Sequence, residues 1–193
     1  MTKARGKRGF GDPERPERLV DAALAIMLVK GVQGINHRAV AAEAGVPLGS
    51  TTYYFRDLDA LLIATIEHLI QRRRKEMSAW CADISTLEEL IGRLAELIVT
   101  RLTRDRMETV LSYELYFLAL RRPAFSFYSE TSTQVLRDTI RRFADESTTQ
   151  ALTVLVDGFV IEGLLSARLP TIGDLLSAMS AVVRGAREGK SRT

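Results

Sequence analysis

The amino-acid sequence predicts an all-α fold of about nine helices. Apolar residues recur at intervals of three and four over most of the 193 residues, which places them along one face of a helix. The strict alternation of apolar and polar residues that is typical of strands is nearly absent. Helix-ending residues, among them Gly31, Gly45, Pro123 and Pro170, separate the periodic segments. These three observations together predict a bundle of helices.

The first helix is expected over residues 15–30. Its apolar stripe runs through Leu19, Ala23 and Met27, and Gly31 closes it. This helix is expected to complete a three-helix N-terminal domain with the two short helices that follow.

Two short helices joined by a glycine-containing turn are predicted next. The first runs from His37 to Ala44 and is rich in small residues, and Gly45 supplies the left-handed residue that ends a helix. Pro47 suits the first turn of the second, where its missing N–H leaves no bond unmade. This pattern is typical of a helix-turn-helix that reads DNA.

The second short helix has two different faces. Thr51 and Phe55 are expected to hold it in place, on the side that also carries Leu48 and Thr52. The other positions offer small and hydroxyl-bearing groups at the spacing that a helix in a DNA groove requires. These positions are Gly49, Ser50, Tyr53 and Tyr54.

Six further helices are predicted in the remaining chain. Asp57 is expected to cap a long helix that reaches about Trp80, in which the basic run 72–75 is interpreted as a solvated face. Thr86 and Glu89 form a capping box for a helix that ends near Leu102. The other helices are expected over about 104–121, 125–145 and 148–167, and from Thr171 or Asp174 to about Gly185.

The segment GVPLGSTTYYFRDLDALL, residues 45–62, resembles the recognition segment of the TetR family of bacterial transcriptional repressors. The resemblance is strong from about Pro16 to Leu62. It implies an all-helical homodimer that binds palindromic operator DNA and releases it when a small molecule enters the C-terminal domain. Family members often carry a lysine, which commonly meets a phosphate, where this chain has Leu58. Arg56 is the residue expected to supply that charge instead.

The resemblance and the helix geometry together name the candidate DNA contacts. Arg38 matches a family position that contacts DNA, and a guanidinium can pair with guanine or with phosphate; an ordinary surface arginine is the alternative. Gly49 either permits close approach to DNA or is a mere defect in helix propensity. Tyr54 is either a phosphate contact or a core aromatic, and His37 a weaker candidate that need only begin its helix. The predicted contacts are Arg38, Leu48, Gly49, Ser50, Thr52, Tyr53, Tyr54 and Arg56.

The charge of the chain agrees with a DNA-binding protein. The net charge is only +3, so an electropositive surface must come from clustering. Such a cluster occurs at Lys3, Arg5, Lys7 and Arg8, with no acid among them. A flexible basic arm of this kind can reach DNA phosphates or the minor groove. A solvated, disordered start is the alternative.

Composition and cysteine content predict a cytoplasmic protein. The chain is 46% hydrophobic and 26% charged, which is ordinary for a soluble globular protein. No apolar run reaches the roughly 18 to 20 residues that a membrane span needs, and no signal-peptide core follows the basic start. Cys81 is the only cysteine, which fits a reducing compartment. It is interpreted as a buried thiol, with a redox sensor as the alternative.

The last two predicted helices carry more apolar surface than one core face needs. Packing against a second copy is therefore expected, and the resemblance implies that these helices build a four-helix dimer interface. Burial of both helices within a single chain is the alternative. The predicted interface residues are Leu152, Leu155, Phe159, Gly163, Leu175, Met179 and Val182.

An effector pocket is predicted where aromatic residues concentrate in the helical body. Ordinary core packing is the alternative for each of them. Glu114 lies among apolar neighbours, so it is expected to point inward and either bind a cationic or hydrogen-bonding ligand or pair with an arginine. The predicted pocket residues are Trp80, Tyr113, Glu114, Phe117, Phe143 and Phe159.

The sequence offers little support for an enzyme. It contains only two histidines, His37 and His68, and no nucleophile elbow, phosphate-binding loop or metal-ligand spacing, so no cofactor and no metal are predicted.

The expected partners are double-stranded operator DNA, a small-molecule effector and a second copy of the chain, without a membrane. The alternative is a helical interaction protein or ligand-binding protein without specific DNA binding. The expected domains are a basic arm (1–14), a helix-turn-helix domain (15–56), an effector-binding and dimerisation body (57–187) and a polar tail (188–193).

Overall fold

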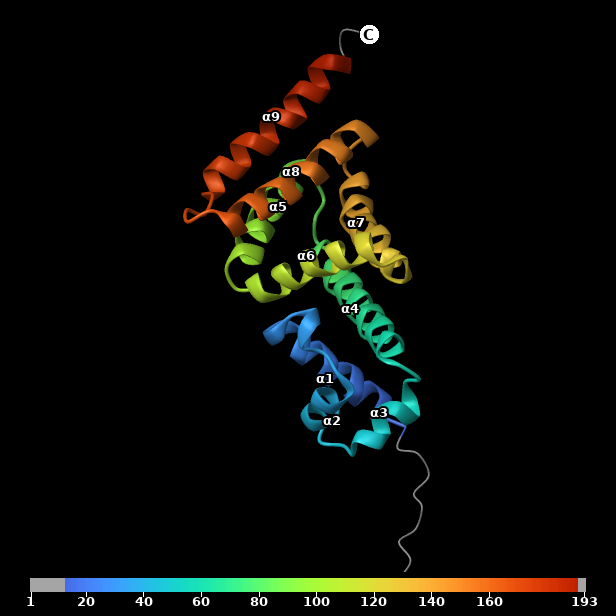
Figure 1. Ribbon diagram of the computed structural model, residues 1–193. Helices are drawn as coiled ribbons and strands as arrows, with labels where there is room; N and C mark the ends of the chain where they lie inside the picture. The colour runs from blue at the N-terminus through green and yellow to red at the C-terminus, as the bar shows by residue number, and fades with distance from the viewer. Residues whose placement is uncertain (1–12, 191–193) are drawn as a thin grey trace, which may run out of the picture. The chain divides into compact units, whose positions relative to one another are not determined.

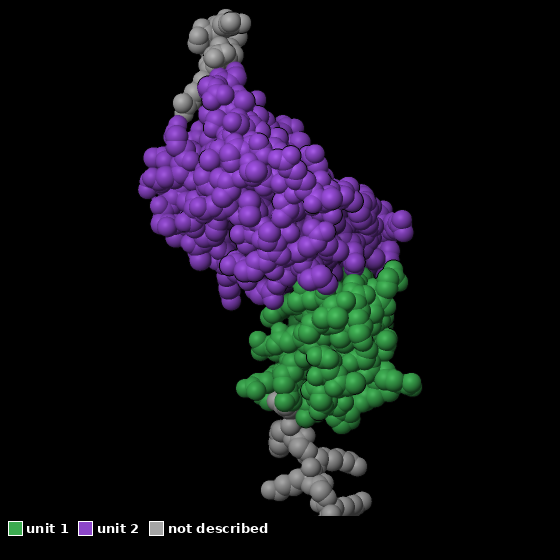
Figure 2. Space-filling view, turned by 90° about the vertical axis from the view of Figure 1, so that its left-hand side faces the viewer, with its two compact units in different colours: residues 1–68 green, residues 69–193 purple. Residues whose placement is uncertain are grey.

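The computed structural model describes residues 13–190, with side chains up to residue 186. Regular structure in this range consists of nine α-helices and two short 3-10 helices, without a strand (Figure 1). The chain divides into two compact units between His68 and Leu69, inside the fourth helix, which therefore contributes residues to both (Figure 2). The predicted basic arm at Lys3, Arg5, Lys7 and Arg8 lies outside the described residues.

The first unit contains α1 (Arg15–Lys30), α2 (His37–Glu43), α3 (Leu48–Tyr54) and the start of α4 (Leu58–Trp80). α1 packs against α2, and α2 against α3. Leu19 and Ala23 are completely buried, as the apolar stripe predicted, and so is Val40 of α2. His68 of α4 lies 3.5 Å from Asp21 of α1, measured from Nε2 to Oδ1.

The second unit contains the rest of α4 and five further helices. These are α5 (Leu87–Leu102), α6 (Arg106–Arg121), α7 (Ser126–Arg141), α8 (Glu146–Leu165) and α9 (Ile172–Lys190). α5 packs against α6, α8 and α9, while α7 packs against α6 and α8. Of these helices, α5 contributes the most residues to the buried core cluster.

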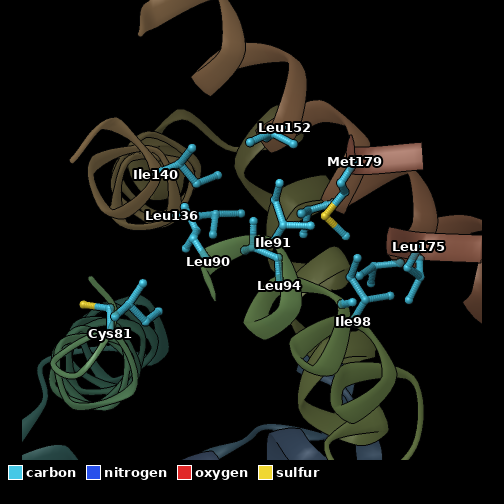
Figure 3. Packing of buried hydrophobic residues seen from close by; sticks show 14 of the residues in the cluster. Cys81, Leu90, Ile91, Leu94, Ile98, Leu136, Ile140, Leu152, Leu175 and Met179 are labelled. Atoms are coloured by element: carbon cyan, nitrogen blue, oxygen red, sulfur yellow. The ribbon is translucent and has the colours of Figure 1, made fainter. Parts of the chain in front are cut away.

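The core of this unit surrounds α5. Leu90, Leu94 and Ile98 of α5 are completely buried. Figure 3 shows Leu90 and Ile91 between Leu136 and Ile140 of α7 on one side and Met179 of α9 on the other. Cys81 is also buried in this cluster, and the guanidinium of Arg142 donates to its sulfur at 3.2 Å.

Local capping sets several helix ends where the sequence predicted them. Thr86 accepts a hydrogen bond from the backbone N–H of Glu89, whose carboxylate accepts one in return from the N–H of Thr86, which confirms the capping box. Asp57 accepts from the N–H of Ala60 at 2.8 Å and so caps α4. Gly45 adopts a φ of 62°, the left-handed conformation expected of it.

Three boundaries differ from the prediction. The segment 123–125 is a 3-10 turn, and α7 ends at Arg141 instead of about Asp145. Asp145 instead caps α8, because its carboxylate accepts from the N–H of Thr148 at 2.8 Å. α9 continues to Lys190, so the expected polar tail begins within the helix.

α8 is apolar on more than one face. By length and composition alone it is the one described helix that could cross a membrane, although 39% of its apolar window is buried inside the structure. Leu152, Val156 and Val160 are buried in the core, while Val154 and Leu165 expose 63% and 83% of their surface. One side of α8 therefore belongs to the core, and the other is apolar without being covered in the single chain.

Candidate DNA-recognition helix and effector cavity

Short-range contacts position the helix-turn-helix. Asn36 caps α2 by accepting a hydrogen bond from the N–H of Ala39 at 2.9 Å. Gly45 and Pro47 reverse the chain before α3. Thr51 is completely buried, and its hydroxyl donates to the carbonyl of Leu48 at 2.8 Å. The inward side of α3 thus holds the helix against its own unit.

The other side of α3 is open. Tyr53 exposes 77% of its surface and Leu48 47%, and Gly49 and Thr52 are also exposed. Ser50 and Tyr54 are partly exposed, and the rings of Tyr53 and Tyr54 meet edge to face with centroids 4.9 Å apart. An added Cβ at Gly49 would meet no atom within 4 Å, so packing within the chain does not require glycine here.

The two arginines predicted to contact DNA differ in their surroundings. Arg38 is exposed on α2. The Nε atom of Arg56 lies 2.9 Å from Oδ2 of Asp57, so the charge of Arg56 is partly engaged by its neighbour. The hydrogen bond from the N–H of Ala60, followed by the Arg56 charge, holds the pKa of Asp57 below its usual value. This carboxylate therefore stays ionised beside Arg56 and reduces its attraction for a phosphate.

The second unit encloses a cavity of about 590 Å³ among α4, α5, α6, α7 and α8. This volume lies within the range of sites that hold a small organic molecule. Its wall combines aromatic and aliphatic surface with an unusual number of charged groups. The lining includes Arg73, Trp80, Arg101, Tyr113, Tyr116 and Asp157.

The basic run on α4 corrects the prediction of a solvated face. Arg73 donates to the hydroxyl of Tyr128 at 3.0 Å, to the carbonyl of Glu108 at 3.1 Å and to Oγ of Ser112 at 2.6 Å. Arg72 donates to the carboxylate of Glu108 at 2.6 Å. These bonds tie α4 to α6 and α7, whereas Arg74 and Lys75 are exposed as expected.

Ionisable groups from four helices, α4, α5, α6 and α8, line the cavity. Burial lowers the pKa of Arg101, the charge of Arg73 lowers it further, and the opposite charge of Asp157 counteracts only part of this shift. Burial raises the pKa of Asp157, although the residue has accessible surface where it lines the cavity. Burial also raises the pKa values of Tyr113 and Tyr116 to about 12. We expect their phenols to stay neutral and to act as hydrogen-bond partners at physiological pH.

Two of the six predicted pocket residues, Trp80 and Tyr113, line this cavity. The other four do not. Phe117 is 59% exposed on α6, in an outward stripe with Met107 and Leu120, and Glu114 is partly exposed outside the cavity wall. Phe143 and Phe159 pack against the core cluster instead. Aromatic content alone could not separate these environments, because it does not specify which neighbour a helical face meets.

The predicted dimer residues also need correction. Leu152, Leu175 and Met179 are completely buried within the chain, and Leu155, Phe159 and Val182 pack against the same core. Gly163 is buried, and a Cβ added there would overlap the side chain of Leu102 on α5. The exposed apolar side of α8 carries different residues: Val154, Ile161 and Leu165.

Sequence reasoning missed Arg73, Arg101 and Asp157 as cavity residues. Arg73 belongs to a run of four basic residues, and Arg101 and Asp157 lie in two other helices, so no local motif marks any of the three as a cavity residue. A weak signal was present, because Arg101 and Asp157 each follow or precede apolar residues that face the core. No group of three potential metal ligands occurs among the described residues.

Residues 85–188 match the family described as "Tetracyclin repressor-like, C-terminal domain". The chain belongs to the TetR family of transcriptional regulators. This match covers more than half of the chain and complements the helix-turn-helix resemblance at the other end.

Named relatives and solved structures agree with this membership. The nicotine-responsive transcriptional repressor HdnoR of Paenarthrobacter nicotinovorans is 22% identical over 174 residues, which cover 84% of this chain and 90% of the relative. The regulator BetI of Brucella melitensis biotype 2 is 26% identical over 188 residues, covering 89% of each protein. The multidrug-binding protein EbrR, crystallised with ethidium, is 34% identical with a TM-score of 0.73, covering 89% of this chain and 99% of EbrR. A transcriptional regulator of Streptomyces coelicolor A3(2) is 26% identical with a TM-score of 0.80, covering 88% of this chain and 98% of that one.

Proposed function

We propose that this DNA-binding transcriptional regulator works as a cytoplasmic homodimer that leaves a palindromic operator when a small molecule fills the α4–α8 cavity. The observation that carries the proposal is α4 itself. Its residues Arg73 and Trp80 form part of the cavity wall, and the same continuous helix begins in the unit that contains α2 and α3. A change in the cavity therefore acts on a helix shared with the DNA-binding unit.

α3 is the proposed recognition helix. Gly49 permits close approach of the backbone to DNA, while Leu48, Ser50 and Thr52 are positioned to contact base edges or thymine methyls. Tyr53 and Tyr54 are proposed to donate to phosphates. Arg38 is the principal cationic contact, because it is exposed and forms no ion pair with the residues that the structure describes. Arg56 is proposed as a weaker phosphate contact because Asp57 adjoins it.

A second copy is proposed to cover the exposed side of α8. Val154, Gly158, Ile161 and Leu165 follow one another at intervals of four, three and four residues, which places them on one helical face. α9 offers small residues, Ala178 and Ala181, that let another helix approach closely. Two recognition helices in such a dimer are expected to bind half-sites about one DNA turn apart.

The effector acts by differential affinity. A ligand that fits the cavity better in one position of α4 shifts the population towards that position. If that position is incompatible with two recognition helices in adjacent major grooves, the operator is released. EbrR is named as multidrug-binding and was crystallised with aromatic ligands, and Trp80 and Tyr113 provide aromatic surface in this cavity. An organic molecule with an apolar, ring-containing body is the proposed effector class.

Selection of duplex DNA from a random pool by the purified protein tests the proposal. A palindromic consensus is expected, with half-sites about one helical turn apart. Arg38→Ala should lower affinity for this consensus by about 1–3 kcal/mol if the residue pairs with a base, and by less if it pairs with phosphate alone. Arg74→Ala, which changes an exposed arginine on α4, is the control and should leave affinity almost unchanged.

Recovery of no consensus at low salt would contradict specific DNA recognition. The chain would then act as a helical ligand-binding or interaction protein. A consensus without two-fold symmetry would contradict only the dimeric arrangement.

A further inference from the structure

Four arginines line the cavity, and two of them are engaged by acids. Arg93 lies 3.6 Å from Asp83 and 4.0 Å from Glu96, and its guanidinium also stacks over the ring of Trp80. Arg104 lies 3.1 Å from Asp105. The positive charges of Arg93 and Arg104 are therefore largely compensated by neighbouring carboxylates. The other two, Arg73 and Arg101, have no carboxylate paired with them among the described residues.

Arg73 is held firmly without being neutralised. Its three hydrogen-bond acceptors are the hydroxyls of Tyr128 and Ser112 and a backbone carbonyl, all of which are uncharged. The carboxylate of Glu108, which also lines the cavity, is engaged by Arg72 at 2.6 Å. The guanidinium of Arg73 therefore keeps a fixed orientation and its full positive charge.

Arg101 makes no side-chain hydrogen bond or ion pair within the part of the chain that the structure describes. Arg101 is partly buried and lines the cavity together with Arg73, whose positive charge lowers the pKa of Arg101. The opposite charge of Asp157 of α8 raises the pKa of Arg101, but by less than burial or the repulsion from Arg73 lowers it. Tyr113 and Tyr116 of α6 line the cavity as well, as phenols that we expect to be neutral.

This part of the cavity thus presents two guanidinium groups against one carboxylate. A positive charge that is partly buried and only partly compensated is costly, and an anionic oxygen group that accepts from it reduces that cost. Guanidinium matches a carboxylate or sulfonate especially well, because two parallel N–H groups can donate to two oxygens. The phenol of Tyr116 can donate to the same group, whereas that of Tyr113 donates to the carbonyl of Asp157 at 3.4 Å.

We propose that the effector carries an anionic oxygen group, such as a carboxylate or sulfonate, which binds Arg101 beside Arg73, while its ring-containing body lies towards Trp80. This inference rests on the proposed ligand-responsive function and adds the charge of the ligand. It differs from a binding site for cations, in which Asp157 would be the principal contact. Arg101 is then the residue that makes the cavity prefer an anionic ligand to a neutral or cationic one.

Two fluorescent probes that differ in a single group test the proposal. 1-Anilinonaphthalene-8-sulfonate carries the anion, and N-phenyl-1-naphthylamine has the same rings without it. Trp80 is the only tryptophan of the chain, so energy transfer from it to either probe reports binding near the cavity. The wild-type protein should bind the sulfonate at least about tenfold more tightly than the neutral amine.

Variants locate the source of this preference. Arg101→Gln should reduce sulfonate affinity by about tenfold and leave the amine unaffected. Asp157→Asn removes a repelling carboxylate and should strengthen sulfonate binding, so the proposal remains testable if Arg101→Gln does not fold. Arg121→Gln removes an exposed charge from α6 outside the cavity wall and is the control.

Several outcomes would overturn the proposal. They are equal affinity of the two probes in the wild-type protein, an unchanged preference in folded Arg101→Gln, and tighter binding of the cation ethidium than of the sulfonate. If the DNA selection recovers a palindromic operator and any of these outcomes is observed, only the proposed anionic charge of the effector is refuted. If no operator is recovered, the proposed regulatory function is refuted, but a measured preference for the sulfonate over the amine would still support an anion-binding cavity.

Discussion

Two residues of α3 that lie close in sequence, Gly49 and Thr51, have opposite environments. Thr51 is completely buried and fixes the helix, whereas Gly49, two positions earlier, is exposed with no neighbour that a Cβ would meet. Glycine in a helix interior costs stability because its unfolded backbone has more freedom. Packing in the chain does not require Gly49, and we propose close approach of DNA as the reason for it.

Gly49→Ala should therefore separate stability from DNA binding. The free protein should gain about 0.5–1 kcal/mol in free energy of unfolding, while affinity for the selected operator falls because the added methyl obstructs the groove. Denaturant titration and operator binding measure the two effects. Gly92→Ala in α5, where a Cβ also meets no atom, should give a similar gain without loss of affinity. Unchanged operator affinity in Gly49→Ala would refute the close approach.

At the scale of single helices, polar contacts decide how α4 is held in the second unit. Arg73 makes three hydrogen bonds to α6 and α7, and its neighbour Arg74 is exposed. The helical wheel of α4 shows that these two side chains point in different directions, but not what either one meets. The assignment of the basic run to solvent was half right for this reason.

Replacing Arg73 should weaken the second unit. Arg73→Gln removes charge-assisted hydrogen bonds and leaves Ser112 and Tyr128 without their partner, so the free energy of unfolding should fall by about 1.5–3 kcal/mol. Arg74→Gln should change it by less than about 0.5 kcal/mol, as an exposed substitution does. Denaturant titration of both variants makes the comparison. Equal stability of the two would show that the Arg73 contacts do not hold α4.

At the scale of the whole molecule, α8 separates the inside of the chain from its proposed interface. Its buried side meets α5, where Gly163 lies against Leu102, and its other side exposes Val154 and Leu165. The apolar surplus of this helix was predicted correctly, but the residues chosen for the interface were largely those of the core. Helical periodicity groups residues by face without revealing which of two apolar faces turns inward.

Val154→Arg should convert the proposed dimer into monomers. A charged group in an apolar interface is desolvated without a partner, which destabilises association by several kcal/mol. Sedimentation should then show half the mass, and operator affinity should fall because one recognition helix reads only one half-site. Leu120→Arg, at an exposed apolar position of α6, is the matched control. A wild-type protein that sediments as a monomer at micromolar concentration would contradict the interface.

Stability should also depend on pH through the cavity tyrosines. Unfolded tyrosine loses its proton near pH 10, whereas Tyr113 and Tyr116 in the folded chain have pKa values of about 12. The folded state binds more protons between these values, so stability is fully present below pH 10 and is lost as the pH rises towards 12. Tyr116 should account for a loss on the order of 1–2 kcal/mol. Denaturation at several pH values should show a smaller loss in Tyr116→Phe, and an identical pH profile in that variant would refute the contribution.

The sequence by itself determined the helices and many of their ends, because caps, glycine turns and periodicity act between residues close along the chain. Thr86 with Glu89, Asn36 and Gly45 are examples, and the exposure of Tyr53 agrees with its predicted role. Only the tertiary structure decided which apolar face of α8 is core and which charges meet at the cavity. Arg73, Arg101 and Asp157 lie in three helices far apart in sequence, and packing alone brings their charges together in a region where water cannot fully screen them.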